Sequence, residues 1–503
     1  MNWPLVIGGE SGPDWWELLG DLFSPFTLTI TASLARATFV SCVAMLVAWR
    51  LQPALTSGRR SAQRLTWAIL LAPFFCPDLL VGYAYYNFSL SLIHHPIWNE
   101  FFYGLLVTLK AIPVATVLLY FSPPPPLTAE ALYLRQLITA EAGRRLSGPG
   151  WLWWLRGPGL RLLPAAGLTF LLAFQEFEIC SLMNTTAWTL WLFDVRAIGW
   201  ESKQVFARGI YPLLLELIVL GAVLWLYLKL KRDSERGPDL NRTSLSSSGK
   251  SLLWIYLVIA FVLIVAIPIG LVFRGTLAGW SVFLTNQSLL RETGYAIGFA
   301  AASGLLAHGT AVYCMGKRQL GWCSRILIAA ICLPGLCGSF LMSLALFEVF
   351  QISPFYHLYD TPVPLTLGLY LFVLPRALLI QLIRRDVVKR EPVFLGELLR
   401  KSPVTAQRES GWQLRWRQEW WPQFWCLLPV CFWAYFEMTT PSILASPATT
   451  PAPLRLYNFM HYGQGTGLSA MLSAIITAPC LLIALLVLLL KFIQFGWTRR
   501  SST

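Results

Sequence analysis

Residues 252–274 read LLWIYLVIAFVLIVAIPIGLVFR, a run of apolar side chains whose first charged residue is Arg274. About 20 such residues form a helix long enough to cross the hydrocarbon core of a bilayer. Ten further runs of comparable length and character lie near 25–50, 65–88, 101–122, 160–183, 207–230, 289–315, 324–350, 363–383, 423–445 and 467–490. Lipid offers no partner to backbone N–H and C=O groups, so each run is expected to be a helix. The predicted fold class is an all-α polytopic membrane protein with about 11 transmembrane helices.

The composition of the whole chain agrees with this class. Of the 503 residues, 56% are hydrophobic and 13% are charged, against roughly 45–50% and 25% in soluble domains. The formal net charge of +14 would suggest a nucleic-acid partner in a soluble protein. Here the basic residues lie in loops between apolar runs, so we expect the lipid bilayer to surround the chain and no nucleic acid to bind it.

The basic residues also indicate which side of the membrane each loop faces. With the N-terminus outside, about 31 of the 39 Lys and Arg residues fall in cytoplasmic loops or at the inner ends of helices, as the positive-inside rule requires. The C-terminus is then cytoplasmic. We therefore expect a multi-pass protein of the cell (inner) membrane with its N-terminus out and its C-terminus in.

The chain shows an internal repeat. Shifting it by about 260 residues superposes the first five runs on the last five in the same order, and Pro113 meets Pro375. Phe177-Glu178 likewise meets Phe436-Glu437. The run at 252–274 is an extra crossing that gives both repeats the same orientation. The predicted organisation is an external leader 1–24, a first repeat 25–231, a cytoplasmic linker 232–251, an extra transmembrane helix with an outer loop 252–288, a second repeat 289–494 and a cytoplasmic tail 495–503.

Each repeat has one long basic inner loop between its third and fourth apolar runs, at 123–159 and 384–422. The first contains TAEAGRRLSG at 139–148, and the second contains TAQRESG at 405–411. A short helix, a Gly that ends it and a Pro that enters the next membrane helix predict a compact cytoplasmic projection. The alternative is a pair of basic loops held against anionic lipid.

With these loops the chain resembles the membrane subunit of a binding-protein-dependent ABC importer. Such permeases carry a cytoplasmic Glu-Ala-Ala, three residues, Gly motif, followed by Leu-Pro at the next helix. The chain looks most similar to the fused, double-length permeases of the iron(III) and thiamine importers, because LRLYNFMHYG at 454–463 resembles their outer loop before the last helix. The resemblance covers about residues 25–494 by topology, and implies two parallel repeats of the type-I ABC permease fold.

The motif itself is degenerate in both loops. The residues that correspond to it are Glu141, Ala142, Gly143, Gly148, Thr405, Ala406 and Gly411. In the first loop Gly143 replaces the second Ala, and Gly148 comes one residue after the motif Gly position. In the second loop Thr405 replaces the Glu, whereas Ala406 and Gly411 keep their spacing.

The resemblance implies a transport subunit rather than an enzyme. Its two loops would dock two copies of a cytoplasmic ATP-binding subunit, and an extracytoplasmic solute-binding protein would deliver a solute such as iron(III), another small ion or a vitamin. The chain itself carries no predicted catalytic residue, metal site or cofactor. Gly249-Lys250-Ser251 is not a P-loop, because Ser244 occupies the position where that motif needs a Gly.

Three carboxylates inside the apolar runs are candidates for a translocation pathway: Asp78, Glu178 and Glu437. An ionisable group at the centre of a membrane helix costs about 2.5–3.5 kcal/mol on insertion scales, so each is expected to have a structural partner or a functional role. Oxygen ligands facing a shared cavity suit a hard cation. The alternative is that the glutamates pair with Arg36 and Lys110 and serve packing only.

Two other functions stay open at this stage. A secondary transporter could use Glu178, Glu437 and Asp78 to couple transport to an ion gradient. A degenerate permease homologue could have lost transport, in keeping with the altered loop motifs.

Overall fold

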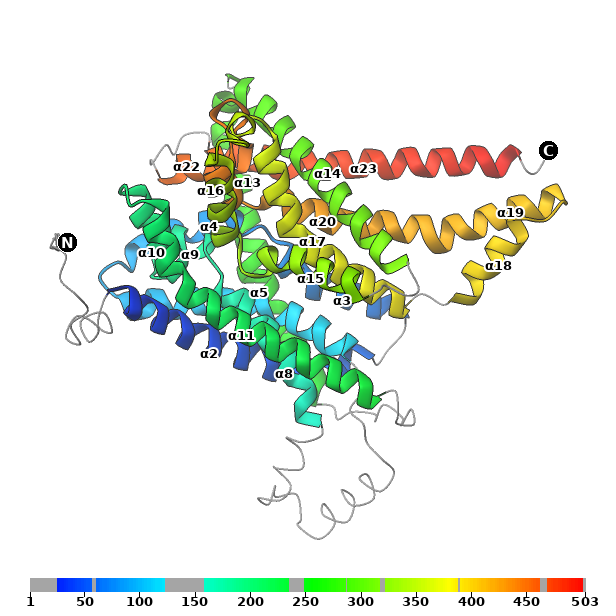
Figure 1. The fold of residues 1–503 in the computed structure, drawn as a ribbon, viewed down its shortest axis with the longest axis horizontal. Coiled ribbons are helices and arrows are strands. Elements are labelled where there is room, and N and C mark those ends of the chain that lie inside the picture. Colours follow the sequence, from blue (N-terminus) through cyan, green and yellow to red (C-terminus); the bar gives the residue numbers. More distant parts are fainter. Residues whose placement is uncertain are drawn as a thin grey trace, which may run out of the picture.

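The computed structural model describes residues 25–56, 60–122, 158–234, 248–285, 287–316, 322–387, 390–461 and 468–500. Within these ranges every regular element is a helix (Figure 1). Eight of the described helices are long and apolar enough to cross a membrane, and two bent helix pairs raise this number to as many as ten. The all-α polytopic prediction is confirmed. The run near 423–445 is not among the ten, because its helix, α20 (Trp421–Phe436), has only 16 residues.

We refer to residues 25–234 as the first half and to residues 287–500 as the second half. The first half contains α2 (Pro25–Thr56), α3 (Arg60–Phe75), α4 (Asp78–Ser91), α5 (Pro96–Phe121), η1 (Pro158–Arg161), α8 (Leu162–Phe174), α9 (Glu178–Leu182), α10 (Trp188–Ala197) and α11 (Ser202–Ser234). The helix between the halves consists of α12 (Ser248–Ala260), the π-helix η2 (Phe261–Ala266) and α13 (Ile267–Thr285). The second half contains α14 (Gln287–Gly316), α15 (Trp322–Leu336), α16 (Ser339–Gln351), η3 (Tyr356–Leu358), α17 (Val363–Val387), α18 (Arg390–Arg400), α19 (Thr405–Arg415), the π-helix η4 (Trp416–Trp420), α20, α21 (Thr439–Leu444), η5 (Pro447–Thr449), α22 (Ala452–His461) and α23 (Leu468–Arg500).

The order and the packing of the helices recur between the halves. Helix α2 packs on α5 and α8, as α14 packs on α17 and α20. The short helix α9 contacts α4, as α21 contacts α16. Each half also has one sharply bent pair, with a bend of 65° between α3 and α4 and of 108° between α15 and α16.

The last helices of the two halves pack differently. Helix α11 lies against α8 of its own half, whereas the main neighbour of α23 is α13. Helix α13 also contacts α4, so it joins the two halves. Most of the residues expected to form an outer loop before residue 289 are helical instead, since α13 continues to Thr285 and α14 begins at Gln287.

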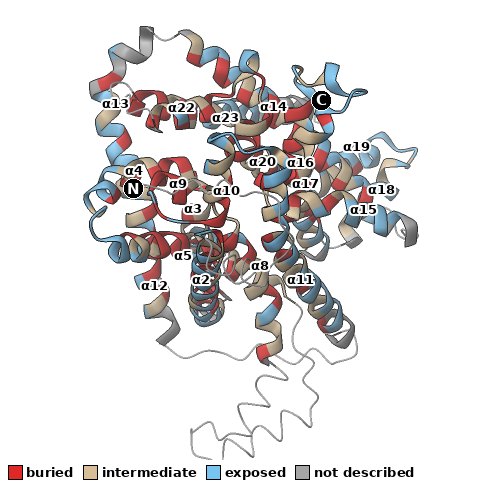
Figure 2. Ribbon diagram, turned by 60° about the vertical axis from the view of Figure 1, so that its left-hand side comes forward, coloured by how far each residue is buried: buried red, intermediate tan, exposed pale blue. Residues whose placement is uncertain are grey.

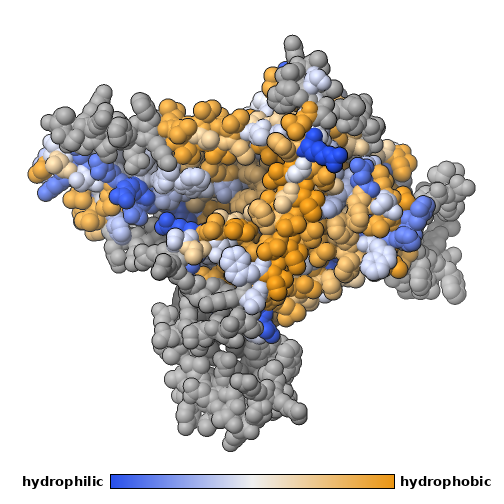
Figure 3. Space-filling model, turned by 180° about the vertical axis from the view of Figure 1, so that it is seen from behind, coloured by the Kyte–Doolittle hydropathy of each residue, from blue (hydrophilic) through white to orange (hydrophobic). Residues whose placement is uncertain are grey.

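Apolar side chains cover much of the outer surface. Figure 2 shows exposed stretches along α2 and α11, and Figure 3 shows a broad hydrophobic surface across the middle of the molecule. On α11 and α23 the exposed large apolar residues are Ile210, Tyr211, Leu214, Ile218, Leu224, Trp225, Leu228, Leu481, Leu482, Leu485, Leu486, Leu488 and Leu489. An apolar surface of this extent is stable in lipid rather than in water.

The π-helix η2 fixes the connecting helix to the first half. A π-turn leaves carbonyls out of the regular α-helical ladder. Two of its carbonyls are bonded from the first half: the Tyr85 hydroxyl donates to the Leu263 oxygen at 2.6 Å, and the Cys76 thiol donates to the Ile264 oxygen at 2.9 Å. The irregular turn is therefore a docking point between the connecting helix and the α3–α4 pair.

A close approach of α15 and α17 depends on Gly335. Pro375 lacks an N–H, so the Leu371 carbonyl four residues earlier has no helical donor. Gly335 lies against that carbonyl, and a Cβ at this position would overlap the Leu371 oxygen and lie 3.2 Å from the Pro375 ring. Small residues allow this kind of backbone contact between membrane helices.

We therefore expect Gly335→Ala to lower the free energy of unfolding by about 1–3 kcal/mol, the usual cost of overpacking. Gly309→Ala is the matched control, because Gly309 lies on the exposed side of α14 with no atom within 4 Å of an added Cβ. The measurement is thermal unfolding of the purified full chain in detergent. Equal melting temperatures for the two variants would contradict this account of the α15–α17 contact.

Candidate functional site: helix breaks between the two halves

Four breaks interrupt the apolar helices of the described chain, two in each half. They separate α3 from α4, α8 from α9, α15 from α16, and α20 from α21. Local residues explain two of them: Pro77 has no N–H to donate, and Gly338 has φ +87°, a conformation that other residues rarely adopt. Each break frees backbone N–H and C=O groups where lipid supplies no partner, so nearby side chains must bond them.

Two glutamates cap the short helices that follow the breaks. The Glu176 carboxylate accepts hydrogen bonds from the N–H groups of Ile179 at 2.6 Å and Cys180 at 3.2 Å. Glu437 accepts one from the Thr440 N–H at 3.2 Å. Each glutamate lies two residues before its helix, α9 or α21, so the helix boundaries match Glu437 with Glu176 and not with Glu178, its sequence-based counterpart.

Glu178 instead connects the two halves. Its Oε1 accepts a hydrogen bond from the Met438 N–H at 3.2 Å. Gln175 makes a second connection, donating from Nε2 to the Leu336 carbonyl at 2.8 Å. The hydroxyls of Ser181 and Tyr457 form a third. The α8–α9 break of the first half is thus bonded to both breaks of the second half.

Two basic side chains balance part of the negative charge. Lys110 forms an ion pair with Asp78 and also donates to the Cys76 carbonyl at the α3–α4 break. Arg376 on α17 donates to the Phe372 carbonyl at 2.6 Å, and its charge acts on Glu437 and Glu178.

We call Asp78, Glu176, Glu178, Glu437, Lys110 and Arg376 the central cluster. Its four acidic members outnumber its two basic ones.

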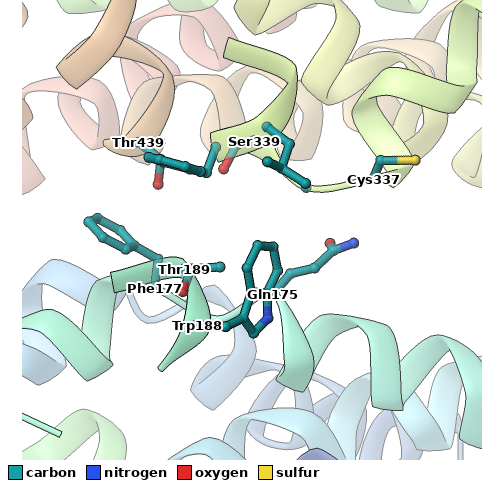
Figure 4. A pocket seen from close by; sticks show the side chains of 10 residues that line it. Gln175, Phe177, Trp188, Thr189, Cys337, Ser339 and Thr439 are labelled. Carbon is teal, nitrogen blue, oxygen red and sulfur yellow. The ribbon is translucent and has the colours of Figure 1, made fainter. Parts of the chain in front are cut away.

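A narrow pocket opens between the halves beside this cluster. In Figure 4, Gln175, Phe177, Trp188 and Thr189 of the first half face Cys337, Ser339 and Thr439 of the second. The cavity volume is about 10 Å³, enough for about one water molecule and far below the roughly 300–1,000 Å³ typical of small-molecule sites. The halves therefore lie close together in this conformation.

The three predicted pathway carboxylates lie in one region but are already engaged. Asp78 pairs with Lys110, Glu178 bonds the Met438 amide, and Glu437 caps α21. Asp78 and Glu437 both interact electrostatically with Glu178. In the described part of the chain, no group of three or more His, Cys, Asp or Glu residues could hold a metal ion.

Among the described residues, Glu178 and Glu437 form no ion pair with Arg36 or Lys110, although Lys110 and Glu178 interact electrostatically. Arg36 pairs with Glu100 and lies over the Tyr103 ring, 4.7 Å from its centroid. The carboxylate that pairs with Lys110 is Asp78. Sequence analysis also missed Gln175, whose neutral amide gives no sign of its role in an apolar run.

The candidate ATPase-coupling residues divide into two groups. Glu141, Ala142, Gly143 and Gly148 lie outside the described residues. Thr405 and Ala406 lie in the exposed first turn of α19, and Gly411 is buried in the same helix.

Helices α18 and α19 form a hairpin that projects beyond the bundle (Figure 1). A Cβ on Gly411 would lie 2.5 Å from the Arg400 amide nitrogen and 2.9 Å from the Gly396 oxygen. Glycine at this position therefore lets the two helices touch.

Comparison with known proteins gives no further guide. No family model, no curated protein and no solved structure matches the chain. Functional inference rests on the residues and their geometry.

We expect Lys110→Met to destabilise the protein by about 3 kcal/mol, because removing one member of a largely buried ion pair leaves the other charge uncompensated. The Lys110 side chain is 12% exposed and that of Asp78 is 36% exposed. The double variant Asp78→Asn/Lys110→Met should recover part of the loss. Denaturant unfolding of the purified full chain gives these free energies.

Lys401→Met is the control, since Lys401 and Glu397 form a 3.6 Å pair with side chains 69% and 53% exposed. Such a surface pair contributes less than about 1 kcal/mol. If the effects of Asp78→Asn and Lys110→Met simply add, the two groups do not stabilise each other.

Proposed function

We propose that the chain is the permease subunit of a binding-protein-dependent ABC importer, with two parallel permease repeats fused in one chain. It would move a solute across the inner membrane, driven by a separate ATP-binding subunit. The main support is the recurrence of helix order and packing in two halves that meet at their helix breaks.

The distribution of polar bonds at the breaks would allow the two halves to move apart, because most of these bonds lie within one half. The Glu176 and Glu437 caps and the Lys110–Asp78 pair each lie within one half. These bonds can persist during a rearrangement. The three bonds between the halves described above, together with the bond between the Tyr83 and Ser469 hydroxyls, join one half to the other and must open. A pathway at this interface would therefore form by separation of the halves rather than by unfolding of the short helices.

The α18–α19 hairpin provides a surface for the ATP-binding subunit. Its exposed apolar side chains are Phe394, Leu395, Leu398, Val404 and Trp412. An exposed apolar patch rimmed by charged residues is typical of a protein-binding site. In the orientation given by the positive-inside rule, with the N-terminus out and the C-terminus in, this hairpin is cytoplasmic.

The hairpin is also connected mechanically to the interface. Helix α19 continues without a gap through η4 into α20, which ends at Phe436. The next residue is Glu437, the cap of α21. Movement of the hairpin would thus be transmitted along one helical rod to the central cluster.

The solute is constrained only by charge. The excess of carboxylates in the central cluster favours a cationic or partly cationic solute. The resemblance implies iron(III), another small ion or a vitamin, with an extracytoplasmic binding protein to deliver it. The described residues would have to rearrange before their carboxylates could ligate a metal, because each is bonded within the protein.

An ion-gradient-driven secondary transporter is the second candidate. The proximity of Asp78, Glu178 and Glu437 between the halves favours it. Uptake by such a transporter would collapse with a protonophore while ATP is kept high, and uptake by an ABC importer would not. A degenerate homologue that has lost transport would show no uptake under either condition.

We expect Leu398→Asp to weaken association with the ATP-binding subunit by about tenfold or more, as loss of an apolar anchor does. The test is co-purification of the full chain with an ATP-binding subunit co-expressed from the same gene neighbourhood. Glu397→Ala, at the exposed neighbouring position of α18, should leave the association unchanged. Equal recovery of the subunit with both variants, or uptake that continues without ATP, would refute the proposal.

A further inference from the structure

One face of α11 lies between the two halves. Gly209 and Val223 are two of its positions, seven residues on either side of Glu216. Gly209 lies against Leu341 of the second half, and Val223 lies against Gly167 of α8. Because positions seven apart share one helical face, Glu216 points inward, in the same seam as the pocket.

Glu216 is unusual among the buried charged residues. It lies midway along the span Ser202–Leu230 and is 1% exposed. Neither of its carboxylate oxygens makes a hydrogen bond of normal geometry among the described residues, although the Gln175 amide lies close enough to interact with it. The polar groups that interact with it are Gln175 and Cys337, both of which line the pocket.

Within the described part of the chain, no basic group compensates the carboxylate. Helix α11 packs against α8, α10, α16 and η1. The polar neighbour from α8 is Gln175, at its C-terminal end, and the titratable neighbour is the Cys337 thiol, just before α16.

The charged groups on the other neighbouring elements interact elsewhere. Arg196 of α10 interacts with Glu348 of α16 and lies over the Phe347 ring. Asp194 of α10 acts on Tyr457 rather than on Glu216. Arg161 of η1 donates to the carbonyls of Leu119 and Ser122.

An ionised carboxylate in this environment is strongly disfavoured, so a positive species must neutralise it. A metal ion is a poor fit. Hard cations such as Ca²⁺ take six to eight oxygen ligands, whereas the Glu216 carboxylate and the Gln175 amide are the oxygen-bearing side chains that meet here among the described residues. A proton needs neither extra ligands nor extra space.

We propose that Glu216 is a proton-binding site in the seam between the halves, which holds its proton while the seam is closed and releases it when water enters. Opening of the pocket is thereby linked to the release of one proton. The proton site stands without any assumption about transport, and only its link to opening rests on the proposed function.

Infrared spectroscopy of the purified full chain in lipid nanodiscs near neutral pH tests whether Glu216 carries a proton. The carbonyl stretch of a protonated carboxylic acid, identified by its shift in D₂O, should lose one component in Glu216→Gln. Glu348→Gln, in which a half-buried carboxylate of α16 is replaced, should retain that component. Identical spectra for wild type and Glu216→Gln would overturn the proton site. Loss of the component on replacing choline chloride with sodium chloride would overturn it too, in favour of a metal ion.

The link to opening is tested with Cys337 as the only cysteine in the chain, in two backgrounds: one that retains Glu216 and one that carries Glu216→Gln. The rate of Cys337 alkylation by a small maleimide should be similar in both near neutral pH. At alkaline pH the background with Glu216 should react several-fold faster, because the ionised carboxylate draws water into the seam. The charge on Glu216 also acts on the Cys337 thiol, so each rate is divided by the thiolate fraction obtained from the Cys337 pKa measured in that background. Equal rates at every pH would overturn the link and leave the infrared result standing.

Discussion

The structure depends on one constraint: backbone groups freed at a helix break inside lipid must find partners within the protein. Four breaks lie in the described apolar helices, and polar side chains near the centre bond the groups that they free. Glu176 and Glu437 cap the short helices α9 and α21, while Lys110 and Gln175 donate to carbonyls at the ends of α3 and α15. The cost of burying these polar groups is offset because each satisfies backbone that would otherwise be unpaired.

Because of this constraint, most of the polar bonds at the breaks of the described helices hold each half together, and few of them join the two halves. Caps and ion pairs that belong to a single half make each half a stable unit, whereas few polar bonds join the breaks of one half to those of the other within the described chain. The projecting α18–α19 hairpin leads by a continuous helix to one of those breaks. An ATP-driven movement of the hairpin, if the proposed function holds, would act on the seam where Glu178 meets Met438 and where Glu216 is buried.

Prediction from the sequence succeeded where the deciding physics is local. Apolar length located eight of the eleven expected spans as single helices and two more as bent helix pairs. The run at 423–445 was overestimated, because its helix ends before Glu437. Asp78 and Glu437 both interact electrostatically with Glu178, but the helix boundaries match Glu437 with Glu176 and not, as the repeat in the sequence had suggested, with Glu178. Their partners could not be predicted, because Arg36 reaches Glu100 and Lys110 reaches Asp78 only through the packing of α2, α4 and α5.

The sequence by itself determined that the chain is a bundle of membrane helices, since apolar length and the need for internal backbone bonds act on each segment separately. Only the tertiary structure decided which carboxylate has which role. Glu176, Glu178 and Glu216 all lie in or beside apolar runs, yet one caps a helix, one joins the halves and one makes no hydrogen bond of normal geometry among the described residues. That difference arises from distances between helices far apart in the chain.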